Sequence, residues 1–146
     1  MTTSRAGRRA FTLLELLFVI IIIGVLASVS FPGLRKTFNR LQLDNTSREL
    51  QSFMNYLEQR SLAEGKLIYL NIDLENSEYW AKFYDSQNRI HSYAFPAAIT
   101  LETDKKQVKF FPDGQIEPTT IRLTDEEGES VSLTTEGVFG RVKIQE

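Results

Sequence analysis

The segment from Phe11 to Phe31 constrains this chain most strongly, because its residues are apolar, small or hydroxylated except for the carboxylate of Glu15. As an α-helix these residues would span about 30 Å, the thickness of one bilayer core. A charge near the middle of a membrane helix costs roughly 2.5–3.5 kcal/mol on insertion scales. A carboxylate near the start of such a segment therefore indicates a specific role.

Residues 1–10 carry Arg5, Arg8 and Arg9 and no acid. Basic residues directly before an apolar span keep that end in the cytoplasm, so we expect the rest of the chain on the far side of the membrane. The alternative is a secretory signal that is cut among the small residues 27–30. That alternative leaves Glu15 unexplained, because a carboxylate is unfavourable in the apolar core of a signal peptide. We therefore expect a retained membrane helix.

The composition limits what the remaining residues can do. The chain has 146 residues, so about a hundred are left for one globular domain. A hydrophobic content of 42% excludes a disordered chain, and a formal charge of −2 gives no bulk attraction to nucleic acid. The absence of cysteine and the single histidine, His91, exclude disulfides, thiolate metal sites and histidine clusters. We expect neither a metal nor a cofactor.

The run Ala10-Phe11-Thr12-Leu13-Leu14-Glu15, between a short basic leader and an apolar helix, resembles the class III signal of type IV pilins and type II secretion pseudopilins. The resemblance implies that a prepilin peptidase cuts between Ala10 and Phe11 and methylates the new N-terminus of Phe11. The apolar helix is then kept, and Pro32 is its expected bend. One departure is Ala10, because the family usually has glycine before the cut.

The same resemblance implies a role for Glu15. After the cut, Phe11 carries a free amine four residues before Glu15. In a filament, the carboxylate of one subunit pairs with the terminal amine of its neighbour. A buried pair costs desolvation on both sides, but an unpaired buried charge costs more, so the pair sets the register of docking. The implied partners are other pseudopilins, the prepilin peptidase, an inner-membrane assembly platform and membrane lipid.

Helical periodicity continues beyond the apolar span. It predicts an amphipathic helix over 32–64 that packs against a domain and ends at Gly65 as its C′ residue. The apolar positions that define it are Leu34, Phe38, Leu41, Leu50, Phe53, Met54 and Leu57. The expected organisation is therefore a leader over 1–10, an apolar helix over 11–31, an amphipathic helix over 32–64 and a periplasmic β-rich domain over 65–146.

From Leu67 onward the period is two, which predicts an antiparallel β-domain and an α+β fold. Pro112-Asp113-Gly114 is a strong turn signal. Alternation in one strand pairs Trp80 with Tyr84 and Tyr79 with Phe83. We expect core packing on both faces; the alternative is that one pair is core and the other lies under a second sheet or at a subunit interface. The expected strands cover residues 66–72, 78–84, 90–95, 99–102, 107–111, 120–123, 130–133 and 138–144.

Two features of this half are similar to the GspH/FimT group of minor pseudopilins and minor pilins: Phe110–Gly114, with its turn, and the closing run Gly140-Arg141-Val142. The resemblance implies a minor pseudopilin of the type II secretion system, anchored in the inner membrane by one span, that helps export folded proteins across the outer membrane. The alternative is a minor type IV pilin that acts in pilus assembly, adhesion or DNA uptake.

In the FimT branch a basic C-terminal motif binds DNA, and Arg141 and Lys143 occupy that position here. Alternation places both side chains on one strand face, where they could meet phosphates. Two cations bind phosphate weakly, and Glu136 and Glu146 lie nearby in the sequence. We therefore expect a solvated strand face and not a nucleic-acid site.

The sequence contains no pattern that predicts catalysis. His91 lies in an alternating strand and is expected to face solvent, and no serine has the glycines of a nucleophile elbow. The acidic run Asp125–Glu129 lacks the ligand spacing of a calcium-binding loop, so we expect a solvated hairpin tip. The sequence thus predicts a non-enzymatic structural protein. A membrane-tethered enzyme or binding module is the alternative from a different class.

Overall fold

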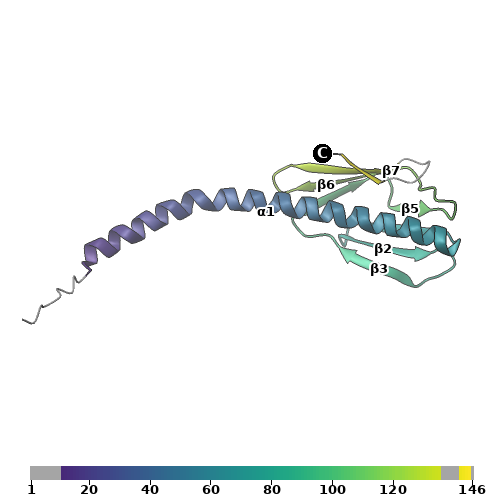
Figure 1. Ribbon diagram of the computed structural model, residues 1–146, viewed down its shortest axis with the longest axis horizontal. Helices are drawn as coiled ribbons and strands as arrows, with labels where there is room; N and C mark the ends of the chain where they lie inside the picture. The colour runs from purple at the N-terminus through teal and green to yellow at the C-terminus, as the bar shows by residue number, and fades with distance from the viewer. Residues whose placement is uncertain (1–10, 136–141, 146) are drawn as a thin grey trace, which may run out of the picture. The chain divides into compact units, whose positions relative to one another are not determined.

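The computed structural model describes residues 11–135 and 142–145. One long helix, α1 (Leu13–Glu64), precedes eight strands (Figure 1). The chain divides into two compact units, residues 1–36 and residues 37–146, and we call the second unit the head domain. The strands are β1 (Ile68–Asp73), β2 (Glu78–Phe83), β3 (Arg89–Ala94), β4 (Ile99–Thr103), β5 (Gln107–Phe110), β6 (Thr119–Asp125), β7 (Ser130–Thr135) and β8 (Val142–Gln145).

The strands form two four-stranded antiparallel sheets, with the orders β3-β2-β1-β5 and β4-β6-β7-β8. The predicted α+β class and the first seven predicted strands are confirmed; of the eighth, predicted over 138–144, residues 142–144 are confirmed and 138–141 lie outside the described residues. The consecutive strands β4 and β5 lie in different sheets. Asp104, directly after β4, accepts hydrogen bonds at Oδ1 from Thr119 Oγ1 (2.5 Å) and Thr120 N (2.9 Å). These bonds tie the end of β4 to the start of β6, after which the chain crosses to the other sheet.

The head-domain part of α1 packs on both sheets, as Figure 1 shows. Towards the first sheet, the Phe53 ring lies 5.7 Å from the ring of Tyr79 in β2. Towards the second sheet, Gln51 Nε2 donates a 2.8 Å hydrogen bond to the carbonyl oxygen of Val142 in β8. One helix face therefore closes a common core, whose buried helix side chains are Leu43, Leu50, Phe53, Met54 and Leu57.

The prediction that the apolar stripe of this helix packs against the domain is wrong for the first part of the stripe. Leu34, Phe38 and Leu41 are 68%, 65% and 56% exposed. At about 100° per residue, Leu41 lies roughly 180° around the helix from buried Leu50. The core-facing side instead passes through Thr46 and Ser47, which are buried although they look like surface residues in the sequence. The buried hydroxyl of Ser47 has a hydrogen-bond partner within the helix, because its Oγ donates to the Asp44 carbonyl at 2.8 Å.

The helix ends at Gly65, as predicted. Gly65 has a φ of 62°, and Lys66 N donates to the Ser61 carbonyl at 3.2 Å, which is the pattern of a Schellman cap. The buried Ser61 Oγ lies 2.7 Å from the Lys66 carbonyl oxygen and 2.9 Å from the Phe110 carbonyl oxygen. This hydroxyl fixes the helix end against β5.

The two faces of β2 differ, so the expectation of core packing on both is wrong. Tyr79 is 2% exposed and Phe83 packs against the core. On the other face, Trp80 is half-buried and Tyr84 is 70% exposed. The pairing by alternation is confirmed, but α1 covers only the Tyr79 face of the sheet.

The predicted turn at Pro112-Asp113-Gly114 is confirmed, since Gly114 N donates to the Phe111 carbonyl at 3.0 Å. Gly114 has a φ of 84°, and a Cβ there would lie 3.3 Å from Leu62 Cδ2. We expect Gly114→Ala to destabilise the head domain by about 1–2 kcal/mol, because an L-residue is strained in this conformation. Thermal unfolding followed by the fluorescence of Trp80 measures the loss.

The matched control is Gly33→Ala, because Gly33 is helical and a Cβ there meets no atom within 4 Å. It should leave the unfolding temperature of the head domain unchanged. Equal unfolding temperatures for both variants would contradict the conformational argument for Gly114.

Candidate assembly site

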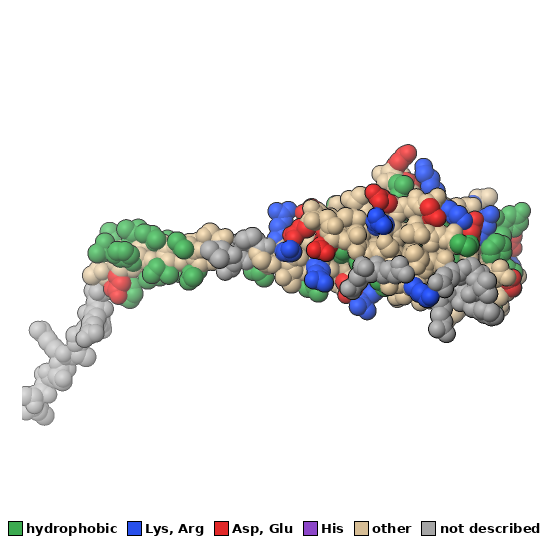
Figure 2. Space-filling model, turned by 90° about the horizontal axis from the view of Figure 1, so that it is seen from above, with side chains coloured by type: hydrophobic (Ala, Val, Ile, Leu, Met, Phe, Trp, Pro, Cys, Tyr) green, Lys and Arg blue, Asp and Glu red, His purple; other side chains and the backbone are tan. Residues whose placement is uncertain are grey.

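The N-terminal part of α1 exposes apolar side chains on all sides. Figure 2 shows hydrophobic side chains gathered there, whereas acidic and basic side chains are scattered over the visible face of the head domain. The exposed fractions of the large apolar side chains in the N-terminal part of α1 range from 39% for Val19 to 86% for Leu13. Among the described residues, α1 alone is long and apolar enough to cross a membrane, with a mean hydropathy of 2.7 over its best window. Such a surface needs lipid or a bundle of other apolar helices around it.

Glu15 lies in the first turn of this helix and is exposed. Its backbone N donates to Thr12 Oγ1 at 3.2 Å, and Leu16 N donates to the Thr12 carbonyl at 3.1 Å. Thr12 is therefore the N-cap residue of α1. Among the described residues, the Glu15 carboxylate has no hydrogen-bond or ion-pair partner, so it is available to a group from another molecule.

Thr12 is a site residue that the sequence reasoning missed. The spacing Thr12-x-x-Glu15 is the capping-box pattern, and it was a sufficient signal for the helix start. The side chain of Ser28 also forms a hydrogen bond within the helix, because its Oγ donates to the Val25 carbonyl at 2.8 Å. The polar groups of Thr12 and Ser28 are thus satisfied within the helix, whereas the Glu15 carboxylate is not.

The other residues proposed for processing lie at the edge of the described structure. Phe11 precedes the helix and is 68% exposed, whereas Ala10 lies outside the described residues. The backbone of α1 is helical through Pro32. The side chain of Pro32 is not among those described, so the expected bend stays a prediction.

The candidate DNA-contact residues are only half described. Lys143 is exposed on β8, between buried Val142 and partly buried Ile144, and Arg141 lies outside the described residues. On the outer face of this sheet, Lys143 is registered against Thr134, and Arg122 against Glu102 and Ser132. The described part of this face therefore combines hydroxyls with charges of both signs.

His91 and residues 126–129 of the acidic hairpin tip are exposed as expected, whereas Asp125 is only 6% exposed and departs from the expected solvated tip. His91 is exposed, but its ring lies 6.0 Å from that of Tyr56 and 6.4 Å from that of Phe53, over the side of α1. At the tip of β6–β7, Asp125 Oδ1 accepts hydrogen bonds from Glu127 N and Glu129 N, both at 2.9 Å. This carboxylate is therefore used to build its own turn.

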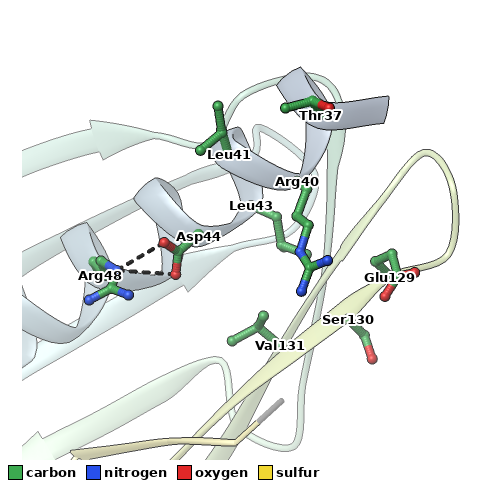
Figure 3. Close-up of a pocket in the computed structure, with 9 residues that line it drawn as sticks. All are labelled: Thr37, Arg40, Leu41, Leu43, Asp44, Arg48, Glu129, Ser130 and Val131. Atoms are coloured by element: carbon green, nitrogen blue, oxygen red, sulfur yellow. Dashed lines mark hydrogen bonds and ion pairs between the residues drawn. The ribbon is translucent and has the colours of Figure 1, made fainter. Parts of the chain in front are cut away.

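A groove of about 360 Å³ lies in the head domain between α1 and the β6–β7 hairpin (Figure 3). Its helix side carries Arg40 and the ion pair of Arg48 Nε with Asp44 Oδ2 at 3.0 Å. Figure 3 shows Arg40 extending towards Glu129 and Ser130. Leu41, Leu43 and Val131 supply apolar surface. A mixture of both charge signs with apolar side chains suits contact with another protein surface.

Comparison with known proteins gives one sequence match and several structural ones. Residues 5–31 match the prokaryotic N-terminal methylation motif. The minor pseudopilin EpsH from the type 2 secretion system of Vibrio cholerae is 12% identical, with a TM-score of 0.60 over 71% of this chain and 96% of that one. The type IV minor pilin FimU of Pseudomonas aeruginosa is 14% identical, with a TM-score of 0.63 over 73% of this chain and 90% of that one. No curated protein sequence matches the chain.

The structural likenesses extend over about seven-tenths of the chain, and the methylation motif includes the start of α1. The chain thus combines an N-terminal methylation motif on an apolar helix with the fold of solved minor pseudopilins and minor pilins. In its fold the chain is similar to the minor pseudopilin EpsH and to the minor pilin FimU.

Proposed function

We propose that this protein is a minor pseudopilin, a structural and non-enzymatic subunit of the type II secretion pseudopilus that helps export folded proteins across the outer membrane. The observation that carries the proposal is the capped, apolar start of α1, whose Glu15 carboxylate has no partner in the described chain. The likeness to EpsH supports the secretion assignment. The likeness to FimU supports the second candidate, a minor type IV pilin.

In the proposed pathway, α1 lies in the inner membrane with the leader in the cytoplasm and the head domain in the periplasm. The prepilin peptidase cuts between Ala10 and Phe11 and methylates the amine of Phe11. An inner-membrane assembly platform then moves the helix from lipid into the filament core. The Glu15 carboxylate pairs there with the terminal amine of a neighbouring subunit, and this pair selects one axial position.

The head domain supplies a second contact in this proposal. Phe38 and Leu41 are exposed on the side of α1 away from the core, and Leu41 also lines the groove beside Arg40. Burial of a large apolar side chain contributes about 1.5–3 kcal/mol. A neighbouring subunit that covers Phe38 and Leu41 would therefore stabilise the filament, whereas the Glu15 pair selects the axial position.

Processing is tested by expressing the full chain with a prepilin peptidase and measuring its intact mass and N-terminal sequence. The expected product starts at methylated Phe11, despite Ala10 before the cut. A product that starts within residues 27–31 would identify a removable secretory signal. An uncut product that starts at Met1 would identify a plain membrane tether, and either result would overturn the proposal.

The two candidate systems are separated by deleting the gene in its own host. Loss of export of a folded enzyme, with surface pili intact, supports the secretion pseudopilus. Loss of surface pili with export intact supports the minor pilin and overturns the secretion assignment. Complementation with the unaltered gene is the control for polar effects of the deletion.

A further inference from the structure

A row of four side chains crosses the outer face of the first sheet, opposite the core. The strand register places Ser92, Trp80, Asn71 and Gln107 next to one another on β3, β2, β1 and β5. Trp80 is the only tryptophan of the chain, and it is half-buried on a face that α1 does not cover. A large ring in this position is available to a second molecule.

The ring of Trp80 is held in place from one side. The guanidinium carbon of Arg89 lies 4.2 Å from the centre of the ring, which is a close cation–π contact. Arg89 Nη1 is in turn 3.3 Å from Glu78 Oε1 on the same strand as Trp80. The ring therefore keeps a defined orientation before any ligand arrives, which lowers the entropic cost of binding.

Two amides stand beside the ring. Gln107 Nε2 donates a 2.8 Å hydrogen bond to Asn71 Oδ1, so each amide orients the other. Asn71 Nδ2 is covered and has no acceptor among the described residues. A groove of about 520 Å³ opens at this place, and its lining includes Asn71, Asp73, Glu75, Trp80, Lys106 and Gln107.

We propose that this groove binds an uncharged oligosaccharide chain. A pyranose ring has one face of C–H groups, which packs on the apolar surface of an aromatic ring such as Trp80. Its hydroxyl and acetamido groups need both donors and acceptors, which the exposed Gln107 supplies with its Oε1 and the second hydrogen of its Nε2, while Asn71 orients this amide. The volume lies within the range of about 300–1,000 Å³ that is typical of small-ligand sites.

The charges of the groove favour an uncharged ligand over an acidic one. Two carboxylates, Asp73 and Glu75, line it with a single ammonium group, that of Lys106. Asp73 accepts hydrogen bonds from the side chain and the backbone N of Asn76 and from Glu75 N, and these bonds hold its pKa below the usual range. Asp73 therefore stays ionised and repels an anion.

The neighbouring row on the same face contains the basic residues. Lys82 and Lys109 lie on either side of Tyr69 in the register of β2, β1 and β5. Neither of them lines the groove. Lys109 is on the same strand as Gln107 and is partly buried, so it offers a matched control for a role of charge on this face.

The test uses the full chain in a detergent without a sugar headgroup, with N-acetylglucosamine and β-glucose oligomers as the probes. Because Trp80 is the only tryptophan, its emission reports directly on the groove. We expect a saturable change in emission and a binding heat in calorimetry, both stronger for longer oligomers. Gln107→Ala should weaken binding about fivefold, the equivalent of one hydrogen bond, whereas Lys109→Ala should leave it unchanged.

Preference for the N-acetylglucosamine oligomers would indicate an amino-sugar chain, and preference for the β-glucose oligomers a plain glucan; both support the proposal. The absence of an emission change and of a binding heat for both probes would overturn it. So would binding restricted to an acidic polysaccharide or to single-stranded DNA, if it weakened steeply with salt and was reduced by Lys109→Ala.

Discussion

Replacement of Glu15 by alanine is expected to remove the subunit from filaments while leaving it in the membrane. The proposed pair with the terminal amine of a neighbour would lose one partner, which costs about 3–5 kcal/mol when the other charge stays buried. That cost corresponds to at least about a hundredfold loss of incorporation. Removal of the charge also favours the lipid state, by at most the roughly 2.5–3.5 kcal/mol that applies at a helix centre, so the membrane anchor is retained.

The measurement is an immunoblot of sheared filaments and of the inner-membrane fraction. Glu15→Gln keeps the size of the side chain and removes its charge, so it should fail like Glu15→Ala. Thr12→Ala removes the N-cap bond but keeps the carboxylate, and a loss of about 1 kcal/mol should reduce incorporation by at most about fivefold, far less than Glu15→Ala does. Normal filaments from Glu15→Gln would show that the charge is not what selects the docked position.

Phe110→Ala is expected to cause the largest loss of stability in the head domain. Phe110 is completely buried, is registered against Ile68 and bridges to Ile116, and its carbonyl oxygen lies 2.9 Å from the buried hydroxyl of Ser61. Removal of a buried phenylalanine ring costs about 3–5 kcal/mol, because the cavity cannot fully collapse. For a domain of this size the unfolding temperature should fall by roughly 10–25 °C.

Phe38→Ala is the matched control, since it removes the same ring from a position that is 65% exposed. It should shift the unfolding temperature only slightly, because surface substitutions usually change stability by about 0.5 kcal/mol or less. In filaments the order should reverse, with Phe38→Ala reducing incorporation of a folded subunit. Equal unfolding temperatures for Phe110→Ala and Phe38→Ala would contradict the core described above.

The strands could be predicted because each has its own alternating pattern and its own turn signal, as in β1, β2 and the turn at Gly114. The sheet order could not, because it depends on contacts between distant residues. The bonds of Asp104 to Thr119 and Thr120 separate β4 from β5, and no local pattern contains them. The buried face of α1 was misassigned for a similar reason, because Thr46 and Ser47 are small enough to let the helix approach the sheets.

The candidate sites likewise differ in whether local sequence or distant contacts define them. Glu15 is visible in the sequence because a single charge contrasts with its apolar surroundings. The groove beside Trp80 is not, because Asn71, Trp80 and Gln107 come from three strands and meet only through the register of the sheet. The cap of Thr12 was available to sequence reasoning, since its spacing to Glu15 is local.

The cap at Thr12 also bears on the order of events during maturation. The proposed cut lies two residues before Leu13, the first helical residue, and the bonds of the cap involve only Thr12, Glu15 and Leu16. On the side of the cut that is retained, a peptidase can therefore take non-helical residues 11 and 12 into its active site without unwinding α1. The helix needs no refolding after the leader leaves, and the new amine stands beside a helix end that is already formed.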